Sequence, residues 1–498
     1  MKIFENVEQL KLARLNAGQL VEVKNIGKYK IDVAGSTGIT LANSAVATPI
    51  MSGTSMNIRQ FGAVGDGVTD DSAAFNAAVA SAPIDCYVPE GTYLIGSEIS
   101  ISDGAFGISF YSNKRPALFN HGGTATLKLG YDGNLIAITG TGTSKYFDIT
   151  FDGIYFDGNG YNRTAGTFIY WTEGARGLNL RNGQATNFRD YGLYCYEVGG
   201  LTMNDFDIFN CGYNIYADTL GDSQVYGGQT GSGAGGGASW VNDNIYMLGS
   251  GGNTHFINHR PNFSGGIGVR IGGNVTRCSF IGGLCDNNLG PGFVLEDNCT
   301  AIKIQGMDIF DNGTTTVKQS GIVITTGQNA TGFSGPAGIQ ILGNSIFDRN
   351  KGTVDEVMSA GIDISTIGNV SLDRIAIVGN NLEQVDTPIA TFPGVKVNSD
   401  KTQANKGVTT SVSGQTVSIP VGAVGVQTIS GIDVSALTSD LTTSSTFALN
   451  FVGATNLDFI ATVIPTAITP TTFDLKVYVG SASATSTATV KVQWQIFN

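Results

Sequence analysis

Aromatic and acidic side chains recur together in the middle of this 498-residue chain, in short segments twenty-odd residues apart. Each segment alternates apolar and polar residues as a half-buried strand does, and in five successive segments the central outward position carries a tyrosine or an arginine. These residues are Tyr170, Tyr194, Tyr216, Tyr246 and Arg270. Tyrosine rings pack on the apolar faces of pyranoses, their hydroxyls bond to sugar oxygens, and arginine pairs with acidic sugars. The pattern predicts a sugar-binding groove; alternatively, the aromatic stack only stabilises the strands.

Carboxylates follow this aromatic column, beside a further predicted binding residue, Tyr196. Glycoside hydrolysis needs two carboxyl groups, about 5–5.5 Å apart for retention or about 6.5–9.5 Å apart for inversion. Glu197 and Asp218 lie on adjacent segments, which suits the shorter separation, whereas Glu173 and Asp218 are two segments apart, near the upper end of the longer one. Glu296 is a further candidate, three segments beyond Asp218. These four acids are the predicted catalytic residues.

Two other functions are compatible with the same residues. One is β-elimination on a uronic acid, with Tyr246 and Arg270 on neighbouring segments as candidates for the base. The other is a surface that binds a glycan and cuts nothing. His255 and His259 form an isolated His-x3-His pair, which we interpret as structural. No metal-binding or nucleotide-binding spacing occurs in the sequence, so we expect no metal and no cofactor.

The elements that must position these residues form a repeat. Eight strands are predicted to begin at residues 168, 192, 214, 244, 268, 292, 321 and 361, with alternate side chains inward. A second strand in several repeats is predicted at residues 207–210, 283–286, 308–311 and 345–348. Two inward columns are entirely apolar, which predicts a solenoid with a continuous core. The first column is Ile169, Leu193, Ile215, Ile245, Val269, Phe293, Ile322 and Ile362, and the second is Trp171, Cys195, Ala217, Met247, Ile271, Leu295, Ile324 and Ile364.

Composition supports a β-rich protein with many turns. The chain has 69 Gly and only 14% charged residues, which disfavours a helical bundle and a disordered chain. A net charge of -12 argues against binding to nucleic acid or to an anionic membrane, and no apolar run is long enough to predict membrane insertion. The six Cys lack zinc spacing and are predicted to be free, mostly buried thiols.

One part of the sequence resembles a known family. FGAVGDGVTDDSAAF (residues 61–75), followed by VPEGTYLI (residues 88–95), is similar to the opening of the pectate-lyase-like superfamily of right-handed parallel β-helices, found in bacteriophage tailspikes. Asp66, Asp70 and Asp71 match this opening, and we predict that they have a capping and structural role in the cap and turn of a helix that runs to about Ala82. The NTD, GDD, GHG and RIK motifs of the polygalacturonase-type enzymes do not occur, so their mechanism is not carried over.

The resemblance implies an all-β protein: a right-handed parallel β-helix with a short N-terminal module and a C-terminal β-sandwich. The predicted parts are a virion-attachment module (1–55), the β-helix opening with its capping helix (56–100), the polysaccharide-binding and catalytic β-helix (101–395), and a sandwich for trimerisation or receptor contact (396–498). The Gly-rich stretch 227–237 is predicted to be a flexible loop beside the groove.

By the same resemblance, the protein is expected to be a homotrimeric tailspike depolymerase. It would cleave a host surface polysaccharide, such as capsule, O-antigen or exopolysaccharide, and would bind a phage tail or baseplate protein through its N-terminus. Its location would be the virion, after assembly in the host bacterial cytoplasm, with its action at the host cell surface. The site would lie within one chain or between two chains of the trimer.

Overall fold

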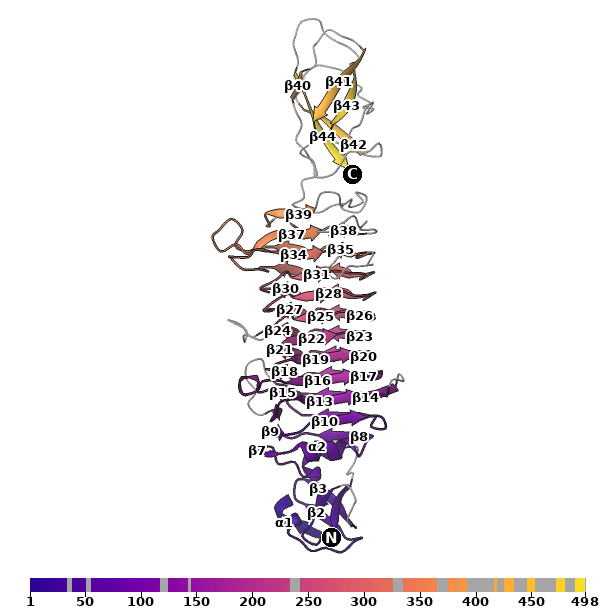
Figure 1. Ribbon diagram of the computed structural model, residues 1–498, viewed down its shortest axis with the longest axis vertical. Coiled ribbons are helices and arrows are strands. Elements are labelled where there is room, and N and C mark those ends of the chain that lie inside the picture. Colours follow the sequence, from indigo (N-terminus) through magenta and orange to yellow (C-terminus); the bar gives the residue numbers. More distant parts are fainter. Residues whose placement is uncertain are drawn as a thin grey trace.

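Three long parallel sheets wind along the chain in a computed structural model of the protein (Figure 1). The structure describes residues 1–33, 38–50, 55–116, 124–141, 145–232, 242–325, 335–364, 375–382 and 384–391, and the backbone of five later strands. Each coil contributes one strand to each sheet in turn, so that every strand pairs with the equivalent strand of the next coil. The predicted all-β parallel β-helix is therefore confirmed.

The first sheet carries the predicted site and is called here the tyrosine sheet. Its strands are β10 (Ile99–Ser102), β13 (Asn134–Thr139), β16 (Thr167–Thr172), β19 (Tyr191–Tyr196), β22 (Tyr213–Ala217), β25 (Ile245–Met247), β28 (Val269–Ile271), β31 (Phe293–Leu295), β34 (Gln319–Ile324), β37 (Met358–Ile364) and β39 (Thr387–Thr391).

The second sheet, called here the pocket sheet, precedes the tyrosine sheet in each coil. Its strands are β7 (Asp66–Asp70), β9 (Gly91–Ile95), β12 (Ala125–Leu129), β15 (Ile154–Asp157), β18 (Gln184–Thr186), β21 (Asp207–Phe209), β24 (Gln229–Gly231), β27 (Arg260–Asn262), β30 (Leu284–Asp286), β33 (Asp308–Phe310) and β36 (Ser345–Phe347). It contains the four second strands that the sequence predicts.

The third sheet, called here the back sheet, was not predicted. Its strands are β6 (Met56–Asn57), β8 (Ile84–Tyr87), β11 (Ile108–Tyr111), β14 (Lys145–Asp152), β17 (Ala175–Arg181), β20 (Val198–Asn204), β23 (Leu220–Tyr226), β26 (Gly252–Ile257), β29 (Ser279–Ile281), β32 (Lys303–Gln305), β35 (Gln340–Leu342) and β38 (Ala376–Val378). In the middle coils very short turns join it to the pocket sheet, as Asp205 and Phe206 do between β20 and β21. Such short turns hide the boundary between two strands in the sequence.

The apolar columns form the core, as predicted. Ile169 pairs with Leu193, Leu193 with Ile215, and Ile215 with Ile245, and all four side chains are buried. The second column follows the same register, from Trp171 through Ile364. Because parallel strands stack about 4.8 Å apart, each apolar residue covers the one below it and keeps water out along the whole helix.

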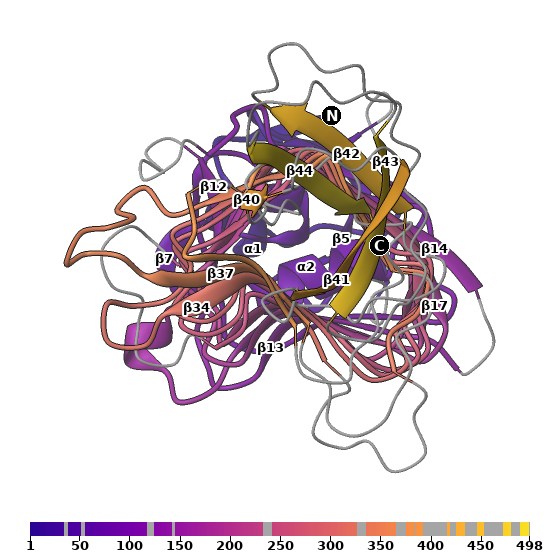
Figure 2. The same ribbon diagram turned by 90° about the horizontal axis from the view of Figure 1, so that it is seen from above.

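The open end of the β-helix is closed by helix α2 (Ser72–Val79), which lies within the outline of the coils in Figure 2. Phe75 of α2 is buried, with its ring centroid 5.7 Å from that of Tyr93 and 5.5 Å from that of Phe110. A 3-10 helix, η1 (Ile58–Phe61), precedes it. Helix α2 ends at Val79, earlier than predicted.

The structural role predicted for the three aspartates is confirmed, but the helix cap differs from the prediction. Asp71 is the N-cap residue, but its side chain makes no cap hydrogen bond and instead accepts from the backbone N–H groups of Val64 and Gly65. Asp70 accepts from the Ser72 N–H at the helix start, and Asp66 opens strand β7. These carboxylates therefore fold the turns around the helix, and only Asp70 bonds to the helix itself.

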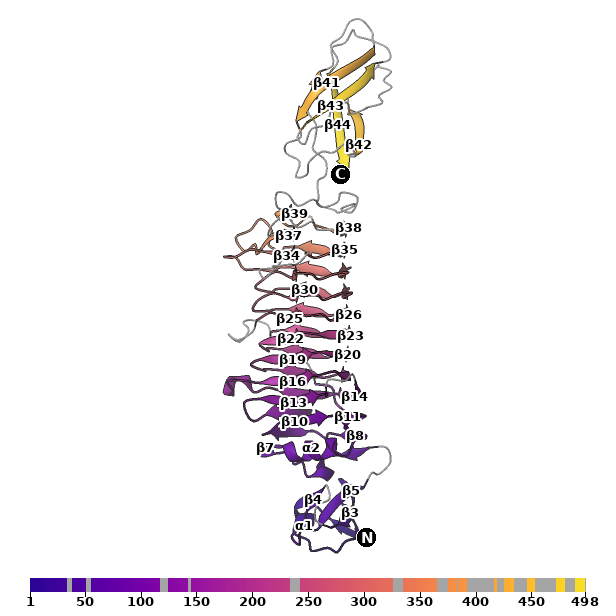
Figure 3. The same ribbon diagram turned by 45° about the vertical axis from the view of Figure 1, so that its right-hand side comes forward.

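Both ends of the chain carry separate sheets. The N-terminal one has the order β1-β2-β3-β5-β4 and its own core, which includes Leu10, Tyr29 and Ile31. Its elements are β1 (Lys2–Phe4), α1 (Val7–Lys11), β2 (Leu20–Val23), β3 (Gly27–Asp32), β4 (Ile39–Thr40) and β5 (Val46–Ile50). The C-terminal strands are antiparallel and form two sheets, β40-β44-β42 and β41-β43, as in the predicted sandwich (Figure 3). Their bounds are β40 (Thr416–Ser418), β41 (Gly425–Asp433), β42 (Thr446–Val452), β43 (Thr472–Val479) and β44 (Thr489–Phe497).

Candidate functional site

The outward column of the tyrosine sheet has the predicted register. Tyr170 pairs with Tyr194, Tyr194 with Tyr216, Tyr216 with Tyr246, and Tyr246 with Arg270. The alternation of strand side chains turns these residues away from the core, so that Tyr170 is 37% exposed and the next three tyrosines are partly exposed. Five consecutive strands thus present a continuous outward row.

The rings of this row contact one another. Tyr170 stacks on Tyr194 with centroids 4.9 Å apart, and Tyr194 stacks on Tyr216 at 5.6 Å. Tyr246 meets Tyr216 edge-on at 5.5 Å, and the Arg270 guanidinium carbon lies 4.9 Å from the Tyr246 ring centroid. Flat aromatic faces and edges are therefore held in fixed positions by their neighbours.

Two tyrosines that the sequence analysis missed extend this row into a surface. Tyr191 and Tyr213 open strands β19 and β22 and stack on each other at 5.8 Å. Tyr191 also contacts Tyr194 at 5.1 Å and Tyr216 at 5.2 Å. The repeated Tyr-x-x-Tyr spacing at 191–194 and 213–216 was the available signal. We call Tyr170, Tyr191, Tyr194, Tyr213, Tyr216 and Tyr246 the tyrosine surface.

The hydroxyl groups of the tyrosine surface are open. No hydrogen bond joins any of the six to another described residue, so each can bond to a ligand. Burial is the first cause that raises the pKa of Tyr216, to about 12, followed by the charges of neighbouring groups. The Tyr216 phenol is therefore protonated at neutral pH and acts as a donor and an acceptor.

Arg270 is compensated by two carboxylates. Its Nε donates to Glu296 Oε1 at 2.6 Å and its Nη2 to Glu296 Oε2 at 3.2 Å, and its Nη1 lies 3.7 Å from Asp243 Oδ2. Glu296 is only 6% exposed. The structure thus joins a predicted binding residue to a predicted catalytic acid in a bidentate ion pair. A sugar carboxylate would have to compete with Glu296 for the guanidinium.

The other three predicted acids lie together at one edge of the tyrosine surface. Glu173 and Glu197 sit in the turns after β16 and β19, where Glu173 N–H donates to the Tyr196 carbonyl. Asp218 follows β22, and its N–H donates to the Cys195 carbonyl, which places it one coil beyond Tyr196. The pKa of the Tyr196 phenol is raised first by the charge of Glu197, then by burial, Asp218 and Glu173. All three carboxylates therefore act on one phenol.

The two glutamates occupy a turn conformation that recurs along this β-helix, for example at Asn182, Asn258 and Asp297. Glu173 has φ 60° and Glu197 has φ 54°, in the left-handed region that favours glycine and asparagine. Both side chains are exposed, and neither they nor Asp218 form an ion pair with a described residue. The Glu197 carboxylate interacts with the Tyr196 phenol beside it. The left-handed backbone therefore does not set these acids apart, and what distinguishes them is their exposure beside Tyr196 without a described cation.

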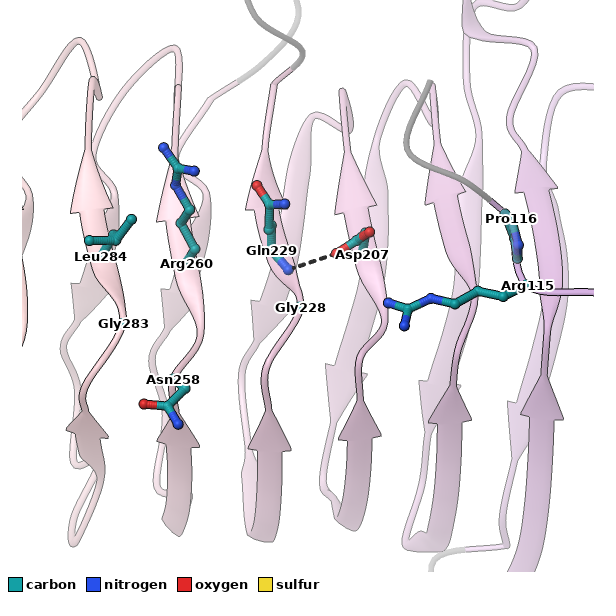
Figure 4. Close-up of a pocket in the computed structure, with 9 residues that line it drawn as sticks. All are labelled: Arg115, Pro116, Asp207, Gly228, Gln229, Asn258, Arg260, Gly283 and Leu284. Atoms are coloured by element: carbon teal, nitrogen blue, oxygen red, sulfur yellow. Dashed lines mark hydrogen bonds between the residues drawn. The ribbon is translucent and has the colours of Figure 1, made fainter. Parts of the chain in front are cut away.

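A pocket lies on a different sheet from the tyrosine surface. Its volume is about 590 Å³. Figure 4 shows its lining on adjacent strands of the pocket sheet and on the turns that lead into them, with Arg115 and Pro116 reaching in from the segment after β11. The lining residues are Arg115, Pro116, Asp207, Gly228, Gln229, Asn258, Arg260, Gly283 and Leu284. The sequence pattern predicts Asp207 on a second strand and indicates no function for it. Its carboxyl is buried, and burial raises its pKa to about 6.

The Gly-rich stretch next to this pocket is only partly a loop. Gln229–Gly231 forms strand β24, in which Thr230 pairs with Ile208 and Pro261, so the predicted flexible loop is wrong for this part. The Thr230 side chain is buried and bonds to His259 Nε2 at 3.0 Å. Residues 233–237 lie outside the described residues. His259 is buried, which lowers its pKa to about 4, and it serves the core as predicted.

The structure also bears on the cysteines, on metal sites and on membrane-spanning helices. All six Cys are free and buried, as expected. Among the described residues, no group of three His, Cys, Asp or Glu side chains has the arrangement of a metal site. Within the same part of the chain, no helix has the length and apolar character needed to cross a membrane.

The fold and this surface define a class: a parallel β-helix with an aromatic, acid-edged face. A family model described as rhamnogalacturonase A/epimerase, pectate lyase-like, matches residues 55–263, which contain the whole tyrosine surface. A glucan 1,3-beta-glucosidase of Cochliobolus carbonum is 28% identical over 193 residues, 34% of this chain and 24% of that protein. The chain thus spans about a quarter of that relative's length.

Solved structures share the fold at low identity. The mannuronan C-5 epimerase A-module of Azotobacter vinelandii has a TM-score of 0.53 at 18% identity and covers 70% of this chain and 93% of its own. The enzymatically active domain of tailspike protein 2 of bacteriophage CBA120 has a TM-score of 0.50 at 14% identity, and the match covers 99% of this chain and 85% of that domain. The tailspike protein of Acinetobacter baumannii phage AM24 has a TM-score of 0.50 at 12% identity, and the match covers 99% of this chain and 93% of that protein.

Proposed function

We propose that this protein is a phage tailspike that binds a polysaccharide of the host cell surface and hydrolyses its glycosidic bonds. The observation that carries the proposal is the tyrosine surface, six tyrosines with open hydroxyls, placed beside three carboxylates that no described cation compensates. Stacked strands about 4.8 Å apart make this surface long enough for several sugar residues in a row. Aromatic rings would carry the pyranose faces, and the acids would act where the chain passes Tyr196.

The charges favour hydrolysis over β-elimination. Elimination requires a positive charge beside the uronate carboxylate, but Arg270 is held by Glu296 and Asp243. Hydrolysis requires two carboxyl groups and no cation. In the proposed reaction, one acid of the pair Glu197 and Asp218 protonates the glycosidic oxygen as its bond to the anomeric carbon breaks. The other attacks that carbon or takes a proton from the attacking water.

The choice of acids follows from their surroundings. Glu197 and Asp218 lie on adjacent coils, and Glu173, one coil further from Asp218, is the alternative partner for a wider separation. Glu296 is proposed to hold Arg270 against Tyr246 rather than to react, because both of its oxygens accept from the guanidinium. Tyr196 and the tyrosine surface are the proposed binding residues.

The proposed biological setting rests on fold and organisation. Two tailspikes share the fold over 99% of this chain. A separate N-terminal sheet suits attachment to a phage tail or baseplate protein through residues 1–55, and the antiparallel C-terminal sheets suit trimerisation or receptor contact beyond residue 395. We therefore propose a homotrimer in the virion, assembled in the bacterial cytoplasm and acting at the cell surface.

Substitution of one acid tests the proposal. Purified protein is incubated with a panel of capsular polysaccharides, O-antigens and exopolysaccharides, and polymer size is followed by chromatography. Asp218→Asn should abolish cleavage while binding, trimer mass and thermal stability are kept. Asp308→Asn, an exposed aspartate on another sheet, is the matched control. Full activity of Asp218→Asn would show that the catalytic site lies elsewhere.

A further inference from the structure

The pocket on the pocket sheet is built from polar side chains on successive coils. Gln184 pairs with Asp207, Ile208 pairs with Thr230, and Gln229 pairs with Arg260, so one column runs through Gln184, Asp207, Gln229 and Arg260. Figure 4 shows the Arg115 side chain extending toward the strand that carries Asp207. Gly228 and Gly283 form part of the wall, and a Cβ atom at either position would clash with the backbone oxygen of Phe206 or His259 on the neighbouring coil.

Most hydrogen-bonding groups in this pocket are open. Asp207 Oδ1 accepts from the Gln229 N–H at 2.9 Å, and no described residue donates to its Oδ2. Arg260 donates from Nε and Nη2 to the Asp286 carboxylate, and its Nη1 makes no hydrogen bond with a described residue. Arg115 donates from Nη2 to the Asp205 carbonyl. The side-chain amides of Gln229 and Asn258 make no hydrogen bond with the described residues.

A buried atom beside the pocket also lacks a partner. Gln184 is 4% exposed, and its Oε1 has no hydrogen-bond partner among the described residues. Its strand neighbour in the pocket is Asp207. An unpaired buried carbonyl costs about 1–3 kcal/mol. Gln184 is not a lining residue, so the acceptor that a ligand in the pocket meets is the Asp207 carboxyl.

The charges in and around the pocket disfavour an anion. Two guanidinium groups face three carboxyl groups, those of Asp205, Asp207 and Asp286. Arg260 is already in a bidentate pair with Asp286, which is 1% exposed. The remaining groups are amides, guanidinium N–H groups and one carboxyl, a set that matches the many hydroxyls of a sugar without an acidic substituent.

From this geometry we propose that the pocket is a second carbohydrate site, which binds uncharged sugar residues independently of the tyrosine surface. Asp207 Oδ2 accepts from sugar hydroxyls, and the Gln229 side-chain amide both accepts from and donates to them. The free N–H groups of Arg115 and Arg260 donate to sugar oxygens. Leu284 and Pro116 contact the apolar face of the ring. A volume of about 590 Å³ lies within the range of small-molecule sites. The inference rests on the proposed function only in the choice of ligand class.

Titration calorimetry with short oligosaccharides tests this site. A printed array of neutral and anionic bacterial polysaccharides first identifies a neutral chain that the full-length protein binds, and oligosaccharides of that chain are then titrated. The wild type should bind at two sites per chain. Gln229→Trp, which fills the pocket, should remove one site, and Tyr216→Ala should weaken the other. Gln305→Trp, an exposed glutamine on the back sheet, is the matched control.

Each outcome separates this inference from the proposed function. One site per chain that is lost with Tyr216→Ala but kept with Gln229→Trp would overturn the second site and leave the proposed function standing. One site lost only with Gln229→Trp would support the pocket and contradict the tyrosine surface. Absence of any bound polysaccharide would overturn both. A change of oligomer mass in Gln229→Trp, measured by light scattering, would show that the pocket is a subunit contact instead.

Discussion

Replacement of Asp207 by asparagine should stabilise the protein in a pH-dependent way. Burial raises the pKa of this carboxyl from 3.8 to about 6. A raised pKa means that ionisation of this carboxyl destabilises the folded state. The loss of stability is absent at pH values below the pKa of the unfolded chain and is complete at pH values above the pKa of the folded protein. A shift of about two pH units corresponds to about 3 kcal/mol. The amide that replaces the carboxyl would stay uncharged and would keep an oxygen for the Gln229 N–H.

Chemical unfolding at two pH values measures this effect. At pH 8 the Asp207→Asn protein should be more stable than the wild type by up to about 3 kcal/mol, and at pH 4 the two should nearly coincide. Asp308→Asn, an exposed aspartate in the same sheet, should show no such gain. A loss of stability of equal size at both pH values would refute the reasoning, since it would mean that the carboxylate is a stabilising partner.

Three further substitutions probe the surface and the core. Tyr216→Ala should weaken oligosaccharide binding about tenfold in calorimetry, because one stacking face is lost. The control Tyr111→Ala breaks an aromatic pair on the back sheet and should leave binding unchanged. Glu296→Gln should lower the unfolding free energy by about 2 kcal/mol, because Arg270 loses its bidentate partner but stays 32% exposed; unchanged stability would argue against the ion pair. Asn312→Ala should cost about 3 kcal/mol in chemical unfolding, because its fully buried amide bonds to Asn288 and to the Cys285 carbonyl; a near-neutral result would contradict these bonds.

The β-helix was predictable because the apolar residues of its core recur in the sequence at a nearly regular spacing. Ile169 and Trp171 are two residues apart in one strand, and apolar residues recur at both positions in each later coil. A half-buried parallel strand leaves this alternation wherever it stacks on its neighbour. The outward register from Tyr170 to Arg270 then follows directly from the inward one, since alternate residues face opposite sides.

Side-chain partners were not predictable in the same way. In the strand register Arg270 pairs with Val294, and Glu296 lies two residues further along the same coil. The ion pair between Arg270 and Glu296 therefore depends on side-chain rotamers and on the burial of Glu296. The pocket depends on residues far apart in the sequence, since Arg115 bonds to Asp205, 90 residues later in the chain. Tyr191 and Tyr213 were hidden because each lies at the start of its strand, before a buried Gly or Asn breaks the simple alternation.

The account depends most on the claim that the acids beside the tyrosine surface hydrolyse a polysaccharide. Analysis of the products from a susceptible polysaccharide tests this claim directly. The account predicts new reducing ends without ultraviolet absorbance from an unsaturated sugar, and their loss in Glu197→Gln and Asp218→Asn. Appearance of that absorbance would show elimination, and a polymer that is bound but never shortened would show a binding protein; either result would contradict the account.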